Sequence, residues 1–332
     1  MPTQATSPDF PPILTQFAYF PYSGPFLPKF ESIYAAWNWV LSTLANLAEA
    51  EDWKGSNSSA AAGGYDHECP ILHKYLHCTY QRLVVERNIA INENGQFSAF
   101  NTGLLDIYDQ EIFGFFMKNS RSGQQPWIFI RWATESDGDL MINFEHLPSM
   151  AEYVTDVSHL VYDMRRKLVL DYAHILGDNL SRFPIELQSN PIKAKQALDA
   201  AVAQTLKRLR RNYKLAIPQW YPKLKEAGAQ LLLPLDLTSS GSADVGLVVA
   251  APNDSQYRGY TILSLEMAYT NARLVARPDS QWLKPLATAM EEQPVTESPV
   301  TGSKRERDLM EPNNDEGPLS PQARHLAVYG RR

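Results

Sequence analysis

The chain has 332 residues, of which 44% are hydrophobic and 20% are charged, so it can bury a sizeable core without disulfides. Its formal net charge of −6 argues against a protein that coats nucleic acid nonspecifically, although a local basic face is compatible with it. Two cysteines are too few for a disulfide framework and indicate a reducing compartment, so we expect a cytoplasmic protein.

The N-terminal segment, residues 1–30, is rich in proline and contains the aromatic run FAYFPY, which predicts an extended arm. It shows no basic segment followed by an apolar core, so no secretory signal is predicted. Residues 31–50 have the length of a membrane span, but their apolar side chains recur at helical spacing with polar side chains between them. We therefore expect an amphipathic helix here and no membrane partner.

A second helix is predicted over residues 71–87, and short strands follow it. Asn94-Gly95 lies between two apolar runs, which is typical of a hairpin turn. The segments 111–117 and 126–133 are apolar and aromatic, as in strands covered on both faces. Residues 145–190 are predicted to be irregular.

The second half of the chain begins with the clearest predicted helix, residues 190–214, and continues with strands at 229–237, 244–252 and 260–265. Another helix is predicted from about Glu266. The fold class is therefore α+β, with a mixed, largely antiparallel sheet covered by helices. The predicted boundaries are an arm over residues 1–30, a single domain over 31–285 and a disordered tail over 286–332, where prolines and charges replace aliphatic side chains.

A candidate metal site is Cys69, His73 and His77, because a spacing of four places these zinc-ligand types on one helix face. Pro70 disfavours helical geometry at Cys69, and the sequence has no second cluster to provide a fourth ligand. The alternative is the polar face of a packed helix. We assign no metal site, and the cofactor stays unknown.

A candidate phosphate-binding surface is the face of the predicted 190–214 helix that carries Lys207, Arg211 and Lys214. A run of charge is usually a solvated face. This run has a single sign, because Asp199 is the only acid between residues 191 and 225, and this favours contact with phosphates.

A candidate catalytic loop is YAHILGDNLSRFP, where His174, Asp178, Asn179 and Arg182 fall within nine residues. A histidine beside a carboxylate and an arginine is able to transfer protons and hold an anion. The alternative is a structured loop in which Asp178 caps a turn. Asn101, in the segment FNTGLLD, offers a donor and an acceptor within a strand-rich region, although that segment is also compatible with a plain turn.

The blocks FNTGLLDIYDQEIFGFFMKN, AHILGDNLSRFP, LLLPLDL and YTILSLEMAYTNARLVARPDSQWL, in this order, resemble the domain of unknown function 3825 family over roughly residues 30–285. The resemblance covers Tyr269, Asn271 and Arg273 in the closing block. It implies no particular reaction. Some members accompany RNA-associated modules, so it implies an RNA or nucleotide ligand.

We therefore expect a protein that binds RNA or a nucleotide and that could also process a phosphate-containing ligand. The chain has no GxGxxG, GKS/GKT, GxSxG or HExxH motif, which removes the best support for ATP-binding and serine-hydrolase functions. One alternative is a metal-independent phosphoesterase or transferase that acts on a small molecule, and another is a protein-interaction scaffold. The expected catalytic residues are His174, Arg182 and Asn101, and the expected ligand-binding residues are Asn179, Tyr269, Asn271, Arg273, Lys207, Arg211 and Lys214. We expect His174, Arg182, Asn101 and Arg273 to line one pocket.

Overall fold

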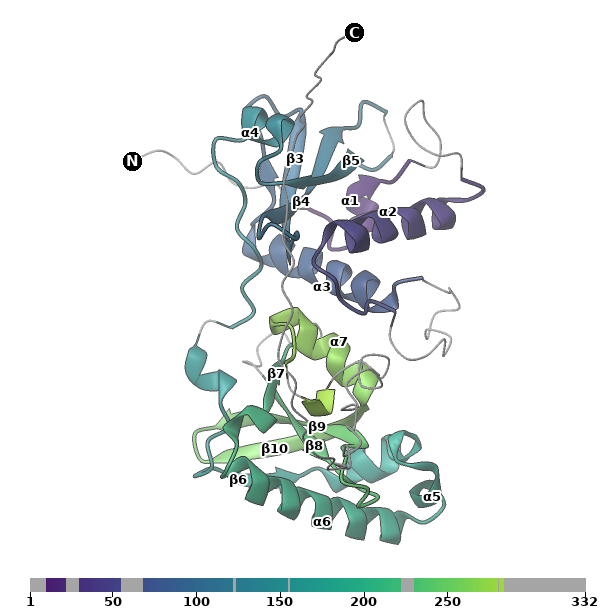
Figure 1. The fold of residues 1–332 in the computed structure, drawn as a ribbon, viewed down its shortest axis with the longest axis vertical. Coiled ribbons are helices and arrows are strands. Elements are labelled where there is room, and N and C mark those ends of the chain that lie inside the picture. The colour runs from purple at the N-terminus through teal and green to yellow at the C-terminus, as the bar shows by residue number, and fades with distance from the viewer. Residues whose placement is uncertain are drawn as a thin grey trace, which may run out of the picture. The chain divides into compact units, whose positions relative to one another are not determined.

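The computed structural model describes residues 10–21, 30–54, 68–121, 124–154, 156–221, 230–279 and 281–283. The α+β fold class is confirmed (Figure 1). The predicted disordered tail, residues 286–332, lies outside the described residues, as does much of the predicted arm.

The strands of the described residues form two five-stranded sheets, with the orders β1-β5-β4-β3-β2 and β6-β10-β9-β8-β7. In each sheet one edge strand, β1 or β6, is parallel to its neighbour, and the other pairs are antiparallel. The predicted mixed, largely antiparallel arrangement is thus confirmed, and it is divided between two sheets. The strands are β1 (Ala18–Tyr19), β2 (Ala90–Ile91), β3 (Phe97–Leu105), β4 (Glu111–Lys118), β5 (Trp127–Thr134), β6 (Lys167–Leu170), β7 (Ile217–Gln219), β8 (Gln230–Leu235), β9 (Val245–Asn253) and β10 (Gln256–Ser264).

The predicted helices are present, and their ends have local causes. The side chain of Ser32 accepts a hydrogen bond at the start of α2, and Asn190 and Ser264 do the same for α6 and α7. Among the described helices, none is long and apolar enough to cross a membrane. The helices are α1 (Leu14–Phe17), α2 (Ile33–Leu47), α3 (Pro70–Glu86), α4 (Gly138–Asn143), α5 (Ile185–Gln188), α6 (Pro191–Leu209) and α7 (Leu265–Val275), with shorter turns η1 (Val157–Leu160), η2 (Ala173–Asp178), η3 (Leu180–Arg182), η4 (Tyr213–Leu215) and η5 (Gln281–Leu283).

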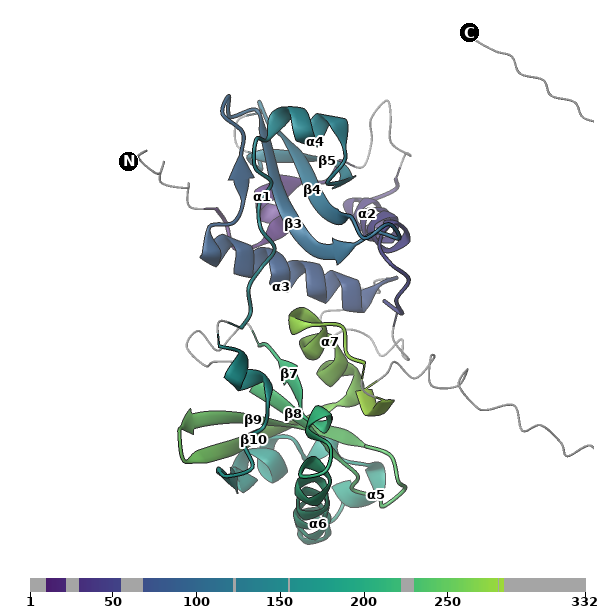
Figure 2. The ribbon, with the colours of Figure 1, turned by 60° about the vertical axis from the view of Figure 1, so that its left-hand side comes forward.

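Helices α3 and α7 lie between the two sheets (Figures 1 and 2). Leu72 of α3 and Ala268 of α7 belong to the same buried cluster as Phe100 of the first sheet and Val248 of the second. Small side chains on α7 let it pack closely, because a Cβ placed on Gly246 of β9 would lie only 3.3 Å from the Cβ of Ala268. One hydrophobic core therefore includes side chains from both sheets.

The outer faces of the two sheets are covered by different helices. The first sheet packs Phe113 and Phe115 against α4, and the second sheet packs leucine and valine side chains against Leu198 and Leu209 of α6. The apolar stripe of α6 therefore faces the core, and the opposite face, with its lysines and arginines, is exposed.

Three local predictions need correction. Residues 14–19, assigned to an extended arm, form α1 and β1, because Leu14 and Phe17 lie one helical turn apart and both are buried. The basic helix ends at Leu209, since the side chain of Asn212 caps the turn η4 that contains Lys214. The region 145–190, predicted to be irregular, contains the edge strand β6.

Candidate functional site

His174 and Asn179 organise one turn of the predicted catalytic loop. His174 is exposed, and its Nδ1 lies 2.7 Å from Oδ2 of Asp178. Asn179 is buried and donates a hydrogen bond of 2.8 Å to the carbonyl of His174. His174 thus has the carboxylate neighbour that the sequence predicted, and Asn179 stabilises the turn.

Arg182 and Asn101 have structural partners. Nη1 of Arg182 donates to the hydroxyl of Thr261 at 3.1 Å and to the carbonyl of Ile262 at 2.7 Å, which ties the loop to β10. Asn101 is fully buried in β3, and its Oδ1 accepts a hydrogen bond of 2.8 Å from the amide of Gly103. These contacts account for both side chains without a ligand.

Tyr269 and Arg273 of α7 both contact Glu51, which follows α2. Nε of Arg273 donates to the two carboxylate oxygens of Glu51 at 2.8 and 2.9 Å, and the Tyr269 hydroxyl donates to one of them at 2.8 Å. The side chain of Arg273 is 12% exposed and that of Glu51 is 4% exposed. Burial alone would lower the pKa of Arg273, but Tyr75 and Glu51 outweigh it, and the pKa lies above its ordinary value. Glu51 is therefore the carboxylate partner of Arg273.

A cavity of about 240 Å³ adjoins this ion pair, and we call it the Arg273 cavity. Its walls include Glu51, Trp53, Tyr75, Gly103, Tyr153 and Arg273. His174, Arg182 and Asn101 are not among its lining residues, so the structure does not bring the four predicted residues together there. The lining of the Arg273 cavity does include residues from two of the sequence blocks that resemble the family: Gly103 and Leu104 of the block on β3, and Arg273 of the block on α7.

Gly103 is required in the wall of the Arg273 cavity. Its φ of +72° favours glycine, and an added Cβ would lie 2.8 Å from the hydroxyl of Tyr75. That hydroxyl donates to the carbonyl of Thr102 at 3.0 Å. Glu51, Trp53, Tyr75 and Tyr153 were not predicted as site residues, because nothing in their local sequence shows that they approach Arg273.

Asn271 belongs to a buried chain of amides. Its Nδ2 donates to Oε1 of Gln219 at 3.3 Å, and Nε2 of Gln219 donates to Oε1 of Gln230 at 2.9 Å. The three side chains connect α7 to β7 and β8. Asn271 therefore satisfies buried polar groups and does not face the Arg273 cavity.

The predicted phosphate-binding residues Lys207, Arg211 and Lys214 are exposed. Nη1 of Arg211 donates to the carbonyl of Lys207 at 2.7 Å. Neither Lys207 nor Arg211 forms an ion pair with an acid among the described residues. Lys207 and Arg211 therefore carry positive charge that no carboxylate of the described residues pairs with.

Beside α6 lies a hollow of about 420 Å³, which we call the α6 groove. Its lining includes Tyr162, Arg166, Lys167, Tyr172, Asp199 and Arg210. Lys167 and Arg210 are exposed, and neither makes a side-chain ion pair within the described residues. Sequence reasoning missed this groove, although the segment YDMRRK carries adjacent basic residues just before β6.

Asp199 is the acid in the lining of the α6 groove, and it is already engaged. Nζ of Lys195 lies 2.6 Å from its Oδ2, and the hydroxyl of Tyr172 donates to its Oδ1 at 2.5 Å. Partial burial acts to raise the pKa of Asp199, but the hydrogen bonds from Lys195 and Tyr172 outweigh it and hold the pKa below its ordinary value. Asp199 thus stays ionised and paired, which orients Tyr172 in the groove.

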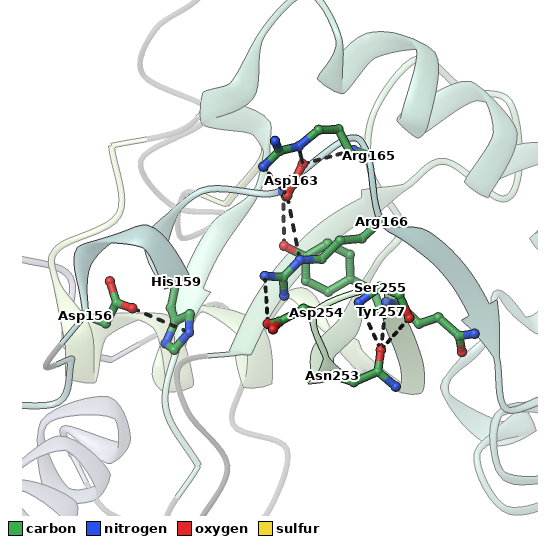
Figure 3. Close-up of polar contacts among 10 residues, drawn as sticks. Asp156, His159, Asp163, Arg165, Arg166, Asn253, Asp254, Ser255 and Tyr257 are labelled. Carbon is green, nitrogen blue, oxygen red and sulfur yellow. Dashed lines mark hydrogen bonds and ion pairs between the residues drawn. The ribbon is translucent and has the colours of Figure 1, made fainter.

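Arg166 reaches the α6 groove from a polar cluster shown in Figure 3. Its Nε lies 3.7 Å from Asp163, and its Nη2 lies 3.7 Å from Asp254, which are both longer than a hydrogen bond. Its guanidinium lies over the ring of Tyr257, 5.4 Å from the centroid. Hydrogen bonds from Arg165 lower the pKa of Asp163 to about 2, so this carboxylate is committed mainly to Arg165.

The three candidate zinc ligands do not form a metal centre. Cys69 is the residue before α3, outside the helix, as Pro70 predicted, and burial raises the pKa of its thiol. The rings of His73 and His77 stack with centroids 6.5 Å apart. Within the described residues, no group of three or more potential metal ligands is close enough to hold an ion.

Comparison with known proteins identifies one family. A family model described as a domain of unknown function, DUF3825, matches residues 44–282. No curated protein and no solved structure matches the chain. The matched span runs from the last turn of α2 to η5 and includes every strand of the two sheets except β1.

Proposed function

The chain belongs to the DUF3825 family, and we propose that it binds single-stranded RNA along the α6 groove. The observation that carries this proposal is the set of available cations beside an aromatic ring: Lys167 and Arg210 line the groove with Tyr172, and no described acid pairs with either of them. A strand of nucleic acid needs such cations for its phosphates and a ring on which a base can stack. Nζ of Lys195 lies over one face of the Tyr172 ring, 4.5 Å from the centroid, so a base would stack on the opposite face.

The charge around the α6 groove extends the surface that a strand could follow. Lys207, Arg208 and Arg211 are exposed at the same end of α6 as Arg210. The protein as a whole is acidic, with a net charge of −6, so the positive charge is local. Local positive charge on an acidic protein favours one defined path for a polyanion over coating of the whole surface.

The proposal includes a cytoplasmic location. Cys69 and Cys78 are free and buried, as expected for a protein from a reducing compartment. The RNA and the location are separate parts of the proposal, and microscopy of the tagged full chain tests the second part.

The binding test uses a fluorescently labelled, unstructured 12-nucleotide RNA and measures anisotropy at fixed salt. Replacing Lys167 and Arg210 by Gln removes two cations of the α6 groove, and we expect roughly a tenfold or greater loss of affinity, because two phosphate contacts are lost. The matched control replaces Lys74 and Lys118 by Gln, two exposed lysines of α3 and β4, and should keep the affinity.

Equal losses in the two double variants would contradict binding in the α6 groove. Equal affinity of the unaltered protein for RNA and for DNA of the same sequence would show that the protein does not recognise the 2′-hydroxyl. The ligand would then be single-stranded nucleic acid in general and not RNA in particular.

A further inference from the structure

The Arg273 cavity has no part in the proposed RNA binding, since its lining shares no residue with the α6 groove. It is formed by segments that are far apart in the sequence. They are the residues that follow α2, helix α3, residues 103–105 at the end of β3, residues 150–153, and residues 273–277 at the end of α7. Its volume of about 240 Å³ suits one small ring system.

The charges around the Arg273 cavity are paired with each other. Glu51 is held by Arg273 and Tyr269, and Glu49 lies 3.8 Å from Arg277. A multiply charged phosphate would therefore add negative charge to a site whose cations are already neutralised. Because the charged groups around the cavity are already paired, the site favours an uncharged ligand.

The guanidinium of Arg273 offers donors to the cavity. Both hydrogen bonds from Arg273 to Glu51 leave from Nε, the hydroxyl of Tyr75 is a further polar neighbour of the guanidinium, and among the described residues the two Nη groups donate to no carboxylate or carbonyl. The oxygens of Glu51 already accept hydrogen bonds, and so does the carbonyl of Thr102. A ligand that meets the end of this guanidinium must therefore present acceptors, and two adjacent acceptors suit its paired Nη groups best.

Aromatic rings complete the site. The guanidinium carbon of Arg273 lies 4.9 Å from the ring centroid of Tyr75 and 5.2 Å from that of Trp53, and these contacts fix the plane of the guanidinium. Tyr153 lines the same cavity. A planar ligand can pack against such rings while its edge meets Arg273.

From this size, neutrality, donor set and aromatic lining, we infer that the Arg273 cavity binds an uncharged purine with adjacent O6 and N7 acceptors, as in guanine or hypoxanthine. Arginine contacts this acceptor pair with two parallel hydrogen bonds. Adenine presents a donor beside N7 and does not match. The ligand is a base or nucleoside, because a phosphate gains nothing from a neutralised site.

The test is calorimetric titration of the full chain with inosine, which carries both acceptors, and with adenosine. We expect saturable binding of inosine, binding of adenosine at least tenfold weaker, and no gain in affinity for inosine 5′-monophosphate. Arg273→Lys should weaken inosine binding at least tenfold, because lysine keeps the charge and loses the paired donors.

A second variant keeps the test decisive if Arg273→Lys does not fold. Ala276 is exposed and lines the cavity in an extended conformation, so Ala276→Trp should block the cavity while the protein stays folded. Ala200→Trp, at an exposed position of α6, is the matched control and should bind inosine normally.

Two results would overturn the inference: no saturable inosine binding by the unaltered protein, or unchanged binding in Ala276→Trp. Equal affinity for adenosine would overturn the acceptor-pair recognition. The Lys167→Gln/Arg210→Gln variant should bind inosine like the unaltered protein, so a failure of this inference is distinguishable from a failure of RNA binding in the α6 groove.

Discussion

The Arg273 cavity and the α6 groove use arginine in opposite ways. Arg273 is mostly buried, and its Nε is committed to the carboxylate of Glu51. Arg210 is exposed at the α6 groove, and no described acid pairs with it. Clusters of basic residues look alike in a sequence, but the carboxylate partner decides whether a cation holds the fold together or is available to a polyanion.

Both regions have an arginine that packs against an aromatic ring, so this kind of contact does not distinguish them. The guanidinium of Arg273 lies 4.9 Å from the ring centroid of Tyr75, and that of Arg166 lies 5.4 Å from the ring centroid of Tyr257. Both contacts orient an arginine. The two arginines differ in their distance from carboxylates. Arg166 lies 3.7 Å from its nearest carboxylates, whereas Arg273 is hydrogen-bonded to Glu51.

The largest expected effect is the loss of the buried ion pair. Glu51→Gln leaves the charge of Arg273 buried without a partner, and we expect the free energy of unfolding to fall by about 3–5 kcal/mol. This corresponds to a drop in melting temperature of roughly 6–20 °C, which calorimetry measures.

Glu49→Gln is the control for this change, because Glu49 is half-exposed and lies 3.8 Å from Arg277. It should cost less than about 1 kcal/mol. Similar melting temperatures for the two variants would mean that the buried pair is not what stabilises this end of α7.

The second effect concerns the ring in the α6 groove. Tyr172→Leu should weaken RNA binding by about 1–3 kcal/mol, because a base loses its stacking surface. Tyr172→Phe removes only the hydroxyl that donates to Asp199, so it should retain most of the affinity. Anisotropy titrations of both variants measure the difference, and equal weakening by Leu and Phe would argue against stacking.

The third effect separates two residues of the predicted catalytic loop. Arg182→Ala should lower the free energy of unfolding by about 1–2 kcal/mol, because the carbonyl of Ile262 loses its charged donor. His174→Ala should change it by less than about 0.5 kcal/mol, since His174 is exposed. Denaturant titrations compare the two, and a larger loss for His174 would contradict these roles.

The helices and most strands could be predicted because their signals are local. Apolar side chains of α2 recur at helical spacing after the Ser32 cap, and Asn94-Gly95 marks the turn between β2 and β3. The short strand β6 was missed, because half-exposed Lys167–Leu170 has no strong pattern and its pairing with β10 is long-range.

The sites were harder to predict, because they depend on contacts between distant segments. Arg273 and Glu51 are 222 positions apart, and no local pattern in the sequence connects them. Asn101 was predicted as a catalytic residue, and Asn179 and Asn271 were predicted as ligand-binding residues, yet each forms a hydrogen bond to a polar group of the fold. The basic face of α6 was predictable because one sign of charge on one helix is a local feature.

The most direct test of this account is the salt dependence of RNA binding. We predict that the slope of log affinity against log salt falls in magnitude by about 1.4 in Lys167→Gln/Arg210→Gln, because each single-strand phosphate contact contributes about 0.7. The control Arg131→Gln/Arg165→Gln removes two arginines that already pair with Asp137 and Asp163, and it should keep the slope of the unaltered protein. Equal slopes in all three proteins, or an equal fall in both variants, would contradict the claim that unpaired cations of the α6 groove hold the phosphates.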